Sequence, residues 1–387
     1  GNKLIYLDNA ATTYPKPEEV YEAMDFVNRN LAMNPGRGGY SKAKEAENII
    51  DETRNKLLKL AGGSDDYNVV LTPSATIALN EVIMGLSFRE GENVYVSAFE
   101  HNAVMRTLHA AEKIYGFNIV ELPLNEDLTI DIEKTKYMFS KDIPGKVFAC
   151  HVSNVTGYIL PVNEIANLAK EYEATVVVDA SQSLGLVPID LGQTHIDYMV
   201  FAGHKTLYGP LGIGGFFIKC GNNLRKYISG GTGTDSLNLE MPDKGIKGYE
   251  PASFNVVAAA GLNAALDEIK DNEAVETLFL REKELENYLV KELEKIHNVK
   301  LYVTGNVNSV GIVPFNIEGY KASETGMILD VDYDVAVRTG YHCAPLIHKH
   351  LKDTDYLGVV RASIGKFTTK EEIDGFVKAV RDIAEEY

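Results

Sequence analysis

From about Glu18 to Leu266, apolar runs alternate with segments that have the residue spacing of helices, and this alternation limits the possible folds to a few. A continuous apolar strand, without in/out alternation, fits a sheet that helices cover on both faces. Helical spacing separates the runs, for example in ATIALNEVIMGL and VNEIANLAKEYE. The pattern predicts an α/β fold with a mainly parallel sheet. Its expected strands are YNVVLT, NVYVSA, NIVELP, KVFACHVS, ATVVVDA, YMVFAG and GIGGFFIK.

The chain continues beyond this sheet into a second, smaller unit. A long amphipathic helix is expected from about Ala258 to Lys295, followed by strand patterns such as SVGIVPFNI and a closing helix. A chain of 387 residues is also too long for one small core. We therefore expect a large α/β domain over residues 18–265 and a smaller α+β domain over residues 266–387. Residues 1–17 are expected to pack with the small domain.

Charge and cysteine content exclude several classes of function. The net charge of −17 argues against binding to nucleic acid or to an anionic membrane, which needs a basic surface. No apolar run approaches the ~18 residues of a membrane span. Cys150, Cys220 and Cys343 are scattered, and no CxxC or HExxH pattern occurs, so we expect no disulfide and no metal site. Without a signal-peptide pattern at the start, the reducing cytoplasm is the expected location.

An acid and a lysine follow two of the predicted strands. Asp179 ends the run VVVD, and Lys205 follows YMVFAG, so both lie at the edge where open α/β sheets bind ligands. These two residues alone are equally compatible with a plain ion pair and with a pyridoxal phosphate (PLP) site. In a PLP site the lysine binds the cofactor and the carboxylate keeps the ring nitrogen protonated. A pocket of low polarity lowers the pKa of a lysine and favours its nucleophilic form.

Further polar residues lie where predicted strands turn into helices. Ser74, Ala75 and Thr76 form such a turn, which is either an anion site or a simple cap by Ser74. His204, next to the lysine, offers another hydrogen-bond donor. His101 either stacks on an aromatic cofactor and carries protons, or is an ordinary histidine at a helix start.

Three residues in the rest of the chain are candidates for handling a substrate. Asn154 follows the strand KVFACHVS, and Arg361 in VVRASIG has the planar fork that binds a carboxylate, although an isolated arginine is also typical of a structural ion pair. Cys343 in RTGYHCAP is, taken alone, a metal ligand, half of a disulfide, a buried core residue or a nucleophile.

Taken together and in order, these motifs resemble the class V aminotransferase family of fold-type I PLP enzymes. Within that family they are similar to the group II cysteine desulfurases, which are related to selenocysteine lyases. RTG-HCA is the most specific of them. The resemblance covers nearly the whole chain and is carried by YLDNAATTYPKP, NPGRGGYS, SATIALN, EHNAV, HVSNVTG, VVVDASQS, AGHKTLYGPLGIGG, GTGTDS, FNVVAAAGL, RTGYHCAP and VRASIGKFTT.

The resemblance implies how PLP is held. Lys205 is the lysine that binds the cofactor covalently, Asp179 pairs with the ring nitrogen, and Gln182 hydrogen-bonds the ring hydroxyl. His101 stacks on the ring, and Asn154 lies beside it. The phosphate is expected to be held by Ser74, Ala75, Thr76 and His204, with Ser253 of the neighbouring subunit in a homodimer.

The resemblance also implies a reaction, the conversion of L-cysteine to L-alanine. Asn154 and Arg361 hold the substrate carboxylate, and Cys343 accepts the sulfur as a persulfide for transfer to an acceptor protein or a small thiol. His342 and nearby positive charge are expected to lower the pKa of the Cys343 thiol, and His101 to move protons at the substrate sulfur.

Three departures from the family pattern and three alternative functions accompany this prediction. Tyr341 replaces a common histidine, Ala202 replaces a serine, and EPAS around Ser253 replaces E-small-G-T. A selenocysteine lyase uses the same residues. A class V aminotransferase has no need of Cys343, and a non-catalytic scaffold of the same fold has no need of Lys205.

Overall fold

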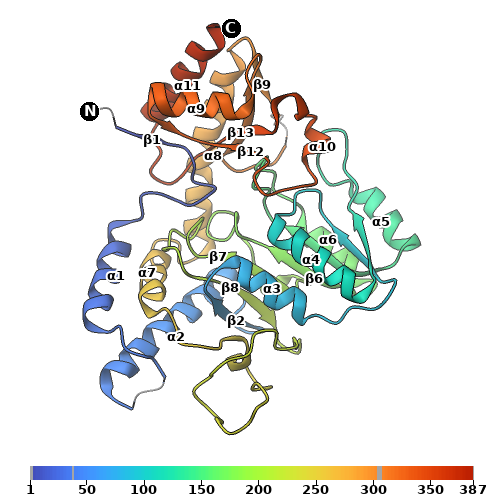
Figure 1. The fold of residues 1–387 in the computed structure, drawn as a ribbon, viewed down its shortest axis with the longest axis vertical. Coiled ribbons are helices and arrows are strands. Elements are labelled where there is room, and N and C mark those ends of the chain that lie inside the picture. The colour runs from blue at the N-terminus through green and yellow to red at the C-terminus, as the bar shows by residue number, and fades with distance from the viewer. Residues whose placement is uncertain (1–2, 37–38, 303–306, 387) are drawn as a thin grey trace.

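The fold contains two main sheets, which Figure 1 shows one above the other. A computed structural model describes residues 3–36, 39–302 and 307–386. Arg37 and Gly38 of the NPGRGGYS motif therefore lie outside the described residues. A seven-stranded sheet occupies the lower half, and a four-stranded sheet the upper half, with both chain ends beside the smaller sheet.

The larger sheet is mainly parallel, as the sequence predicts. In the described ranges, β8 runs antiparallel to both of its neighbours, while the other pairs are parallel. Each of the seven apolar runs forms one strand. In spatial order these are β2 (Tyr67–Thr72), β8 (Gly214–Lys219), β7 (Tyr198–Ala202), β6 (Thr175–Asp179), β5 (Pro144–Cys150), β3 (Asn93–Val96) and β4 (Asn118–Glu121).

Helices cover both faces of this sheet, which explains its continuous apolar strands. Successive residues of β6 point to opposite faces: Val177 packs in one buried cluster, with α3 (Ala75–Gly85) and α4 (Asn102–Tyr115). Val176 and Val178 pack in the other cluster, which the helices of the opposite face complete. Those helices are α2 (Ser41–Ala61), α5 (Ile132–Lys141), α6 (Val162–Lys170) and α7 (Val256–Leu266).

The smaller sheet has its own buried core. Phe315 and Phe376 pack edge to face there, with ring centroids 5.8 Å apart, and Leu7 from the N-terminal segment is part of the same cluster. Its strands, in order, are β12 (Arg338–Gly340), β13 (Val359–Ser363), β10 (Ile312–Ile317) and β9 (Val299–Leu301). Around it lie the pair β1 (Ile5–Tyr6) and β11 (Val335–Ala336), and the helices α9 (Ala322–Tyr333), α10 (His348–Leu351) and α11 (Lys370–Glu385).

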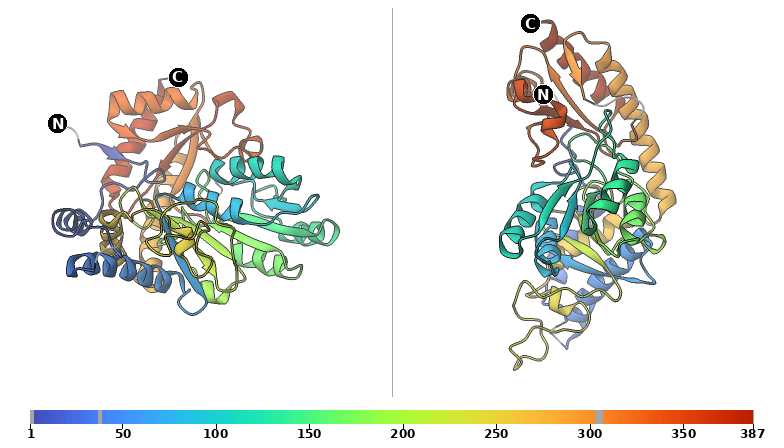
Figure 2. Two further views of the ribbon diagram at one scale, coloured as in Figure 1. Left: turned by 60° about the horizontal axis from the view of Figure 1, so that its bottom comes forward. Right: turned by 90° about the vertical axis from the view of Figure 1, so that its right-hand side faces the viewer.

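The single long helix expected from Ala258 to Lys295 is wrong. The structure has two helices, α7 ending at Leu266 and α8 (Asn272–Glu294) beginning after a break. Asp271 causes the new start, because its side chain accepts a hydrogen bond of 2.9 Å from the Ala274 amide. Helix α8 then runs along the side of the molecule past both sheets (Figure 2).

The remaining elements are short or peripheral. Among the residues that the structure describes, no helix combines the length and the apolar character that crossing a bilayer requires. Helix α1 (Glu18–Asn30) packs on α7 beside the large sheet. The single-turn 3-10 helices are η1 (Leu191–Gln193), η2 (Lys247–Tyr249) and η3 (Thr354–Tyr356).

We expect Phe376→Ala to lower the free energy of unfolding by about 3–5 kcal/mol, because it leaves a cavity in the core of the smaller sheet. Phe26→Ala on α1 is the matched control, since Phe26 is 59% exposed and its loss should change stability by less than about 0.5 kcal/mol. Denaturant unfolding of both variants measures the difference. Equal effects would contradict this assignment of the core.

Candidate active site

A cavity of about 260 Å³ lies where the parallel strands of the large sheet end. Asp179 is the last residue of β6, and Lys205 follows shortly after the end of β7. Loops after β2, β3 and β5 supply further lining residues, since the carboxyl ends of parallel strands meet at one edge. The cavity brings together these residues singled out in the sequence: Ser74, Ala75, Thr76, His101, Asn154, Asp179, Gln182, His204 and Lys205.

Lys205 is half-buried in this cavity, and its pKa is lowered. Burial is the main cause, and the negative charge of Asp179 opposes part of the effect. The salt bridges among the described residues do not include a pair between Lys205 and Asp179, so the plain ion pair is not formed. Asp179 Oδ1 instead accepts hydrogen bonds from the amide (3.0 Å) and hydroxyl (2.6 Å) of Ser181. The lowered pKa favours the neutral, nucleophilic amine.

The start of α3 offers an anion site as well as a cap. Ser74 does cap the helix, since its Oγ accepts a hydrogen bond of 3.1 Å from the Ile77 amide. The N–H groups of Ala75 and Thr76 belong to the first turn, where no intrahelical acceptor is available, and both residues line the cavity. Gly214 on β8 packs against this turn, and a Cβ there would lie 2.8 Å from the Ala75 nitrogen. Only glycine permits this close approach.

Two histidines of the cavity are neutral at pH 7. His101 caps α4, and its Nδ1 accepts a hydrogen bond of 3.0 Å from the Ala103 amide, so the ring proton is on Nε2. His204 Nδ1 lies 3.0 Å from Thr12 Oγ1. Burial lowers the pKa of His101, and burial together with the charge of Lys205 lowers that of His204 to about 4. Both rings therefore act as hydrogen-bonding groups without positive charge.

Arg361 brings a buried positive charge to the same site. Its Nη1 donates a hydrogen bond of 3.0 Å to the Asn154 carbonyl, and its Nη2 lies 3.5 Å from Asp8 Oδ1. Burial lowers the pKa of Arg361 to about 10, which leaves the guanidinium charged at neutral pH. Its Nε has no hydrogen-bond partner among the described residues. Because an unpaired buried donor costs about 1–3 kcal/mol, this nitrogen indicates a place for a ligand acceptor.

Cys343 lies in a tight turn directly after β12. The Ala344 amide donates a hydrogen bond of 3.1 Å to the Tyr341 carbonyl and closes the turn. The two central residues both have positive φ, 54° at His342 and 55° at Cys343, as in a type I′ turn. Glycine and asparagine are the usual residues there, and other residues pay roughly 1–2 kcal/mol each. Contacts outside the turn must therefore stabilise it.

Two such contacts join the turn to the mouth of the cavity. The Asn154 side-chain amide donates a hydrogen bond of 2.7 Å to the His342 carbonyl. The backbone amide of Asn102, next to His101, donates one of 2.6 Å to the Cys343 carbonyl. Cys343 is exposed, whereas Cys150 is buried in the cavity wall. The turn with its accessible thiol is thus joined to Asn154, which lines the cavity, and to the residue next to His101, which also lines it.

His342 adds no positive charge beside Cys343. Burial lowers the pKa of His342 to about 3, with the charge of Arg361 contributing, so the ring is neutral. Its Nε2–H donates a hydrogen bond of 3.0 Å to the Val359 carbonyl instead. The basic groups that interact with Cys343 include Arg338, Arg361 and Lys205.

The N-terminal segment supplies site residues to which the sequence reasoning assigned no role. Asp8 lies 2.8 Å from Arg338 Nη2 and 3.5 Å from Arg361 Nη2. Thr13 donates a hydrogen bond of 2.8 Å to the Lys205 carbonyl. The motif YLDNAATT contains both Asp8 and Thr13. Their partners lie far away in the sequence, so no local pattern reveals these contacts.

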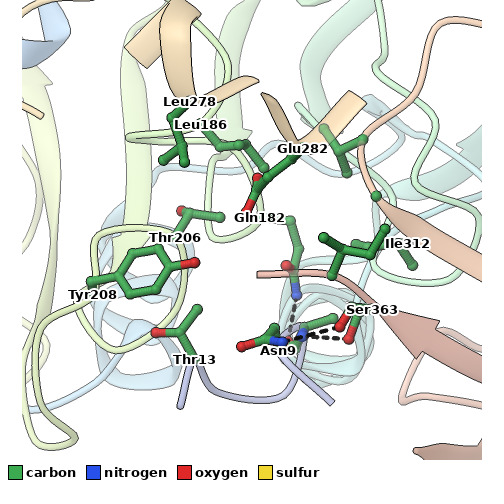
Figure 3. Close-up of a pocket in the computed structure, with 14 residues that line it drawn as sticks. Asn9, Thr13, Gln182, Leu186, Thr206, Tyr208, Leu278, Glu282, Ile312 and Ser363 are labelled. Carbon is green, nitrogen blue, oxygen red and sulfur yellow. Dashed lines mark hydrogen bonds between the residues drawn. The ribbon is translucent and has the colours of Figure 1, made fainter. Parts of the chain in front are cut away.

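Gln182 lines both this cavity and a neighbouring small pocket, and Figure 3 shows that second pocket with Asn9 and Thr13 of the same N-terminal segment. Gln182 Nε2 donates a hydrogen bond of 2.8 Å to the Ala10 carbonyl. The Ala10 amide donates one of 2.8 Å to the Ser363 hydroxyl at the end of β13. Gln182 is therefore fixed, through Ala10, to the strand that carries Arg361.

Two other features complete the placement of the predicted residues. Ser253 is exposed and does not line the cavity of its own chain. The described part of the chain contains no group of three or more His, Cys, Asp or Glu side chains that could hold a metal ion.

Known proteins resemble this chain over its full length. The family model of class-V aminotransferases matches residues 5–376. A probable cysteine desulfurase of Halalkalibacterium halodurans is 32% identical, and the match covers 100% of this chain and 94% of that protein.

Solved structures of cysteine desulfurases also resemble this chain over its full length. A cysteine desulfurase of Thermococcus onnurineus, in its apo form, superposes with a TM-score of 0.90 at 26% identity, over 99% of this chain and 95% of the other. The cysteine desulfurase CsdA of Escherichia coli gives 0.86 at 26% identity, with the same coverage. The fold is that of fold-type I PLP-dependent transferases, as the sequence predicts. This chain belongs to the class-V aminotransferase family.

Proposed function

We propose that this protein is a PLP-dependent cysteine desulfurase, which converts L-cysteine to L-alanine and retains the sulfur on Cys343. The observation that carries the proposal is the exposed Cys343 turn, which hydrogen bonds hold at the mouth of the cavity that contains Lys205 and Asp179. The similarity to cysteine desulfurases over the whole chain supports the same function.

The cavity suits PLP in charge and in hydrogen bonding. The first turn of α3, with Ser74, Ala75 and Thr76, has free N–H groups for a phosphate, and neutral His204 beside it adds a donor or acceptor without a second charge. Asp179 supplies a carboxylate for a protonated ring nitrogen. When bound, the cofactor withdraws electrons from the substrate α-carbon.

The arrangement also suits a small amino acid. Arg361 supplies a buried charge whose Nε lacks a partner, and Asn154 supplies an amide at the cavity wall. Both fit the substrate carboxylate. The lowered pKa of Lys205 favours the neutral amine that takes the α-proton, and His101, with its proton on Nε2, is suited to donating one near the substrate sulfur.

Sulfur transfer follows from the position of Cys343. The Cys343 thiolate attacks the substrate sulfur, so that an S–S bond forms while the C–S bond of the substrate breaks. The electron pair of the C–S bond stays with the carbon, which takes up a proton on the way to alanine. The persulfide then passes from the exposed turn to an acceptor protein or a small thiol.

We further propose the domain division and the assembly expected from the sequence. Residues 18–265 form the PLP-binding domain and residues 266–387 the smaller domain with the cysteine turn, and residues 1–17 pack with the smaller domain. The exposure of Ser253 supports a homodimer in which it reaches the cavity of the partner subunit. Leu237 and Leu239, 99% and 100% exposed on a segment that projects from the body (Figure 1), support the same dimer. The three free cysteines fit the reducing cytoplasm.

We expect Lys205→Ala to lose the visible absorbance of bound PLP, because the amine that binds the cofactor covalently is removed. Absorbance of the purified protein after incubation with PLP measures this directly. Lys219→Ala, which removes a lysine at the end of β8 outside the cavity, is the control and should keep the spectrum of the parent. A visible spectrum that survives in the Lys205 variant would rule out the assignment.

We expect Cys343→Ser to keep the cofactor absorbance and to lose alanine formation from L-cysteine by a factor of about 10³ or more, because the thiolate nucleophile is absent. Cys220→Ser is the matched control, since Cys220 is also exposed but lies outside the cavity. Alanine and sulfide are measured in the presence of dithiothreitol. Full turnover by the Cys343 variant would contradict the proposed function.

A further inference from the structure

A third hydrogen bond to the turn that carries Cys343 comes from a residue shortly after the turn in the chain. The carbonyls of His342 and Cys343 accept hydrogen bonds from Asn154 and Asn102 near the large sheet. The remaining carbonyl, that of Tyr341, lies 2.8 Å from His348 Nε2. His348 is the first residue of α10, five positions after Cys343.

His348 is itself fixed by a buried carboxylate. Its Nδ1 lies 2.5 Å from Asp353 Oδ2, and the side chains of both residues are at least nine-tenths buried. The Asp353 carbonyl accepts hydrogen bonds from the amides of Tyr356 and Gly358, which fold the following segment into a compact turn. Gly358 in turn packs against Gly340, because a Cβ added to Gly358 would lie 2.3 Å from the Gly340 oxygen. Asp353 is therefore braced against the residue that precedes the cysteine turn.

The chemistry of the contacts fixes the direction of the bond to Tyr341. A carbonyl oxygen only accepts, so His348 Nε2 carries a proton and donates it to the Tyr341 oxygen. That oxygen accepts a second hydrogen bond, from the Ala344 amide that closes the turn. The Tyr341 ring packs edge to face on His348 with centroids 4.9 Å apart and covers the imidazole. Tyr341 thus contributes both the carbonyl that accepts the hydrogen bond from His348 and the ring that packs on the imidazole.

We propose that His348, oriented by Asp353, is a positioning residue for sulfur transfer: it holds the Tyr341 carbonyl and thereby fixes the strained turn that presents Cys343. The inference rests on the proposed function of Cys343 as sulfur acceptor. The pair lies outside the cavity that suits PLP, so it should affect the transfer of sulfur and not the binding of cofactor or substrate.

Two substitutions of His348 each keep one of its two hydrogen bonds and remove the other. The amide nitrogen of Gln can reach the position of Nε2 and keep the bond to Tyr341, whereas Asn matches Nδ1 and keeps only the contact with Asp353. We expect His348→Asn to lower kcat for alanine formation roughly tenfold or more, with KM within twofold, because the nucleophile is misplaced. We expect His348→Gln to retain kcat within about threefold. His350→Gln, on the same short helix but near Glu121, is the control.

A structural readout accompanies the kinetics. In His348→Asn the Ala344 amide should exchange its hydrogen at least tenfold faster, because the turn opens more often, while His348→Gln should not differ from the parent. The cofactor absorbance should be the same in all variants. If His348→Asn fails to fold, Asp353→Ala, which leaves His348 without its anchor, is expected to lower kcat at least threefold with unchanged KM.

The outcomes separate this inference from the proposed function. An unchanged kcat in the His348→Asn and Asp353→Ala variants overturns the positioning role, and so does an equal loss in His348→Asn and His348→Gln, which would reflect packing alone. If Cys343→Ser is inactive in the same assays, the proposed function stands in either case. If Cys343→Ser is active, the proposed function fails whatever the His348 variants do.

Discussion

The geometry of the candidate site depends on a short strap, residues Asp8–Thr13, that contacts both sheets. Two candidate site residues belong to different sheets: Lys205 lies in the loop after β7, and Arg361 lies on β13 of the smaller sheet. No covalent link fixes their separation. The strap supplies it: Thr13 binds the Lys205 carbonyl, Asp8 faces the Arg361 guanidinium, and Ala10 joins Gln182 to β13. The strap thereby helps to set the separation between Lys205 and Arg361.

Burial controls charge throughout the site. His101, His204 and His342 are all held neutral, because burial lowers the pKa of each ring. The same effect lowers the pKa of Lys205, although Asp179 opposes it. Arg361 keeps its charge despite burial. Arg361 therefore supplies a positive charge to the site at neutral pH, while burial favours the neutral form of the Lys205 amine.

Much of the fold was predictable because it depends on local patterns, and the exceptions have physical causes. Seven apolar runs gave seven strands, since a two-sided covered sheet leaves a continuous apolar signature. The helix expected over 258–295 broke because Asp271 caps a new helix, a local signal that the overall helical spacing concealed. The cavity residues were predictable as strand ends. The neutral state of His342 was not, because the pKa of its ring is lowered by burial in the folded chain and by the charge of Arg361, which is distant in sequence.

The hydrogen bonds that Asn154, Asn102 and His348 donate to the Cys343 turn all end on its backbone carbonyl oxygens. None of them uses the sulfur atom. A persulfide would extend the Cys343 side chain only beyond its sulfur atom, so these hydrogen bonds would be the same in the thiol and in the persulfide. The empty and the loaded enzyme can therefore share one backbone conformation, and each catalytic cycle can restart without refolding the loop that delivers its product.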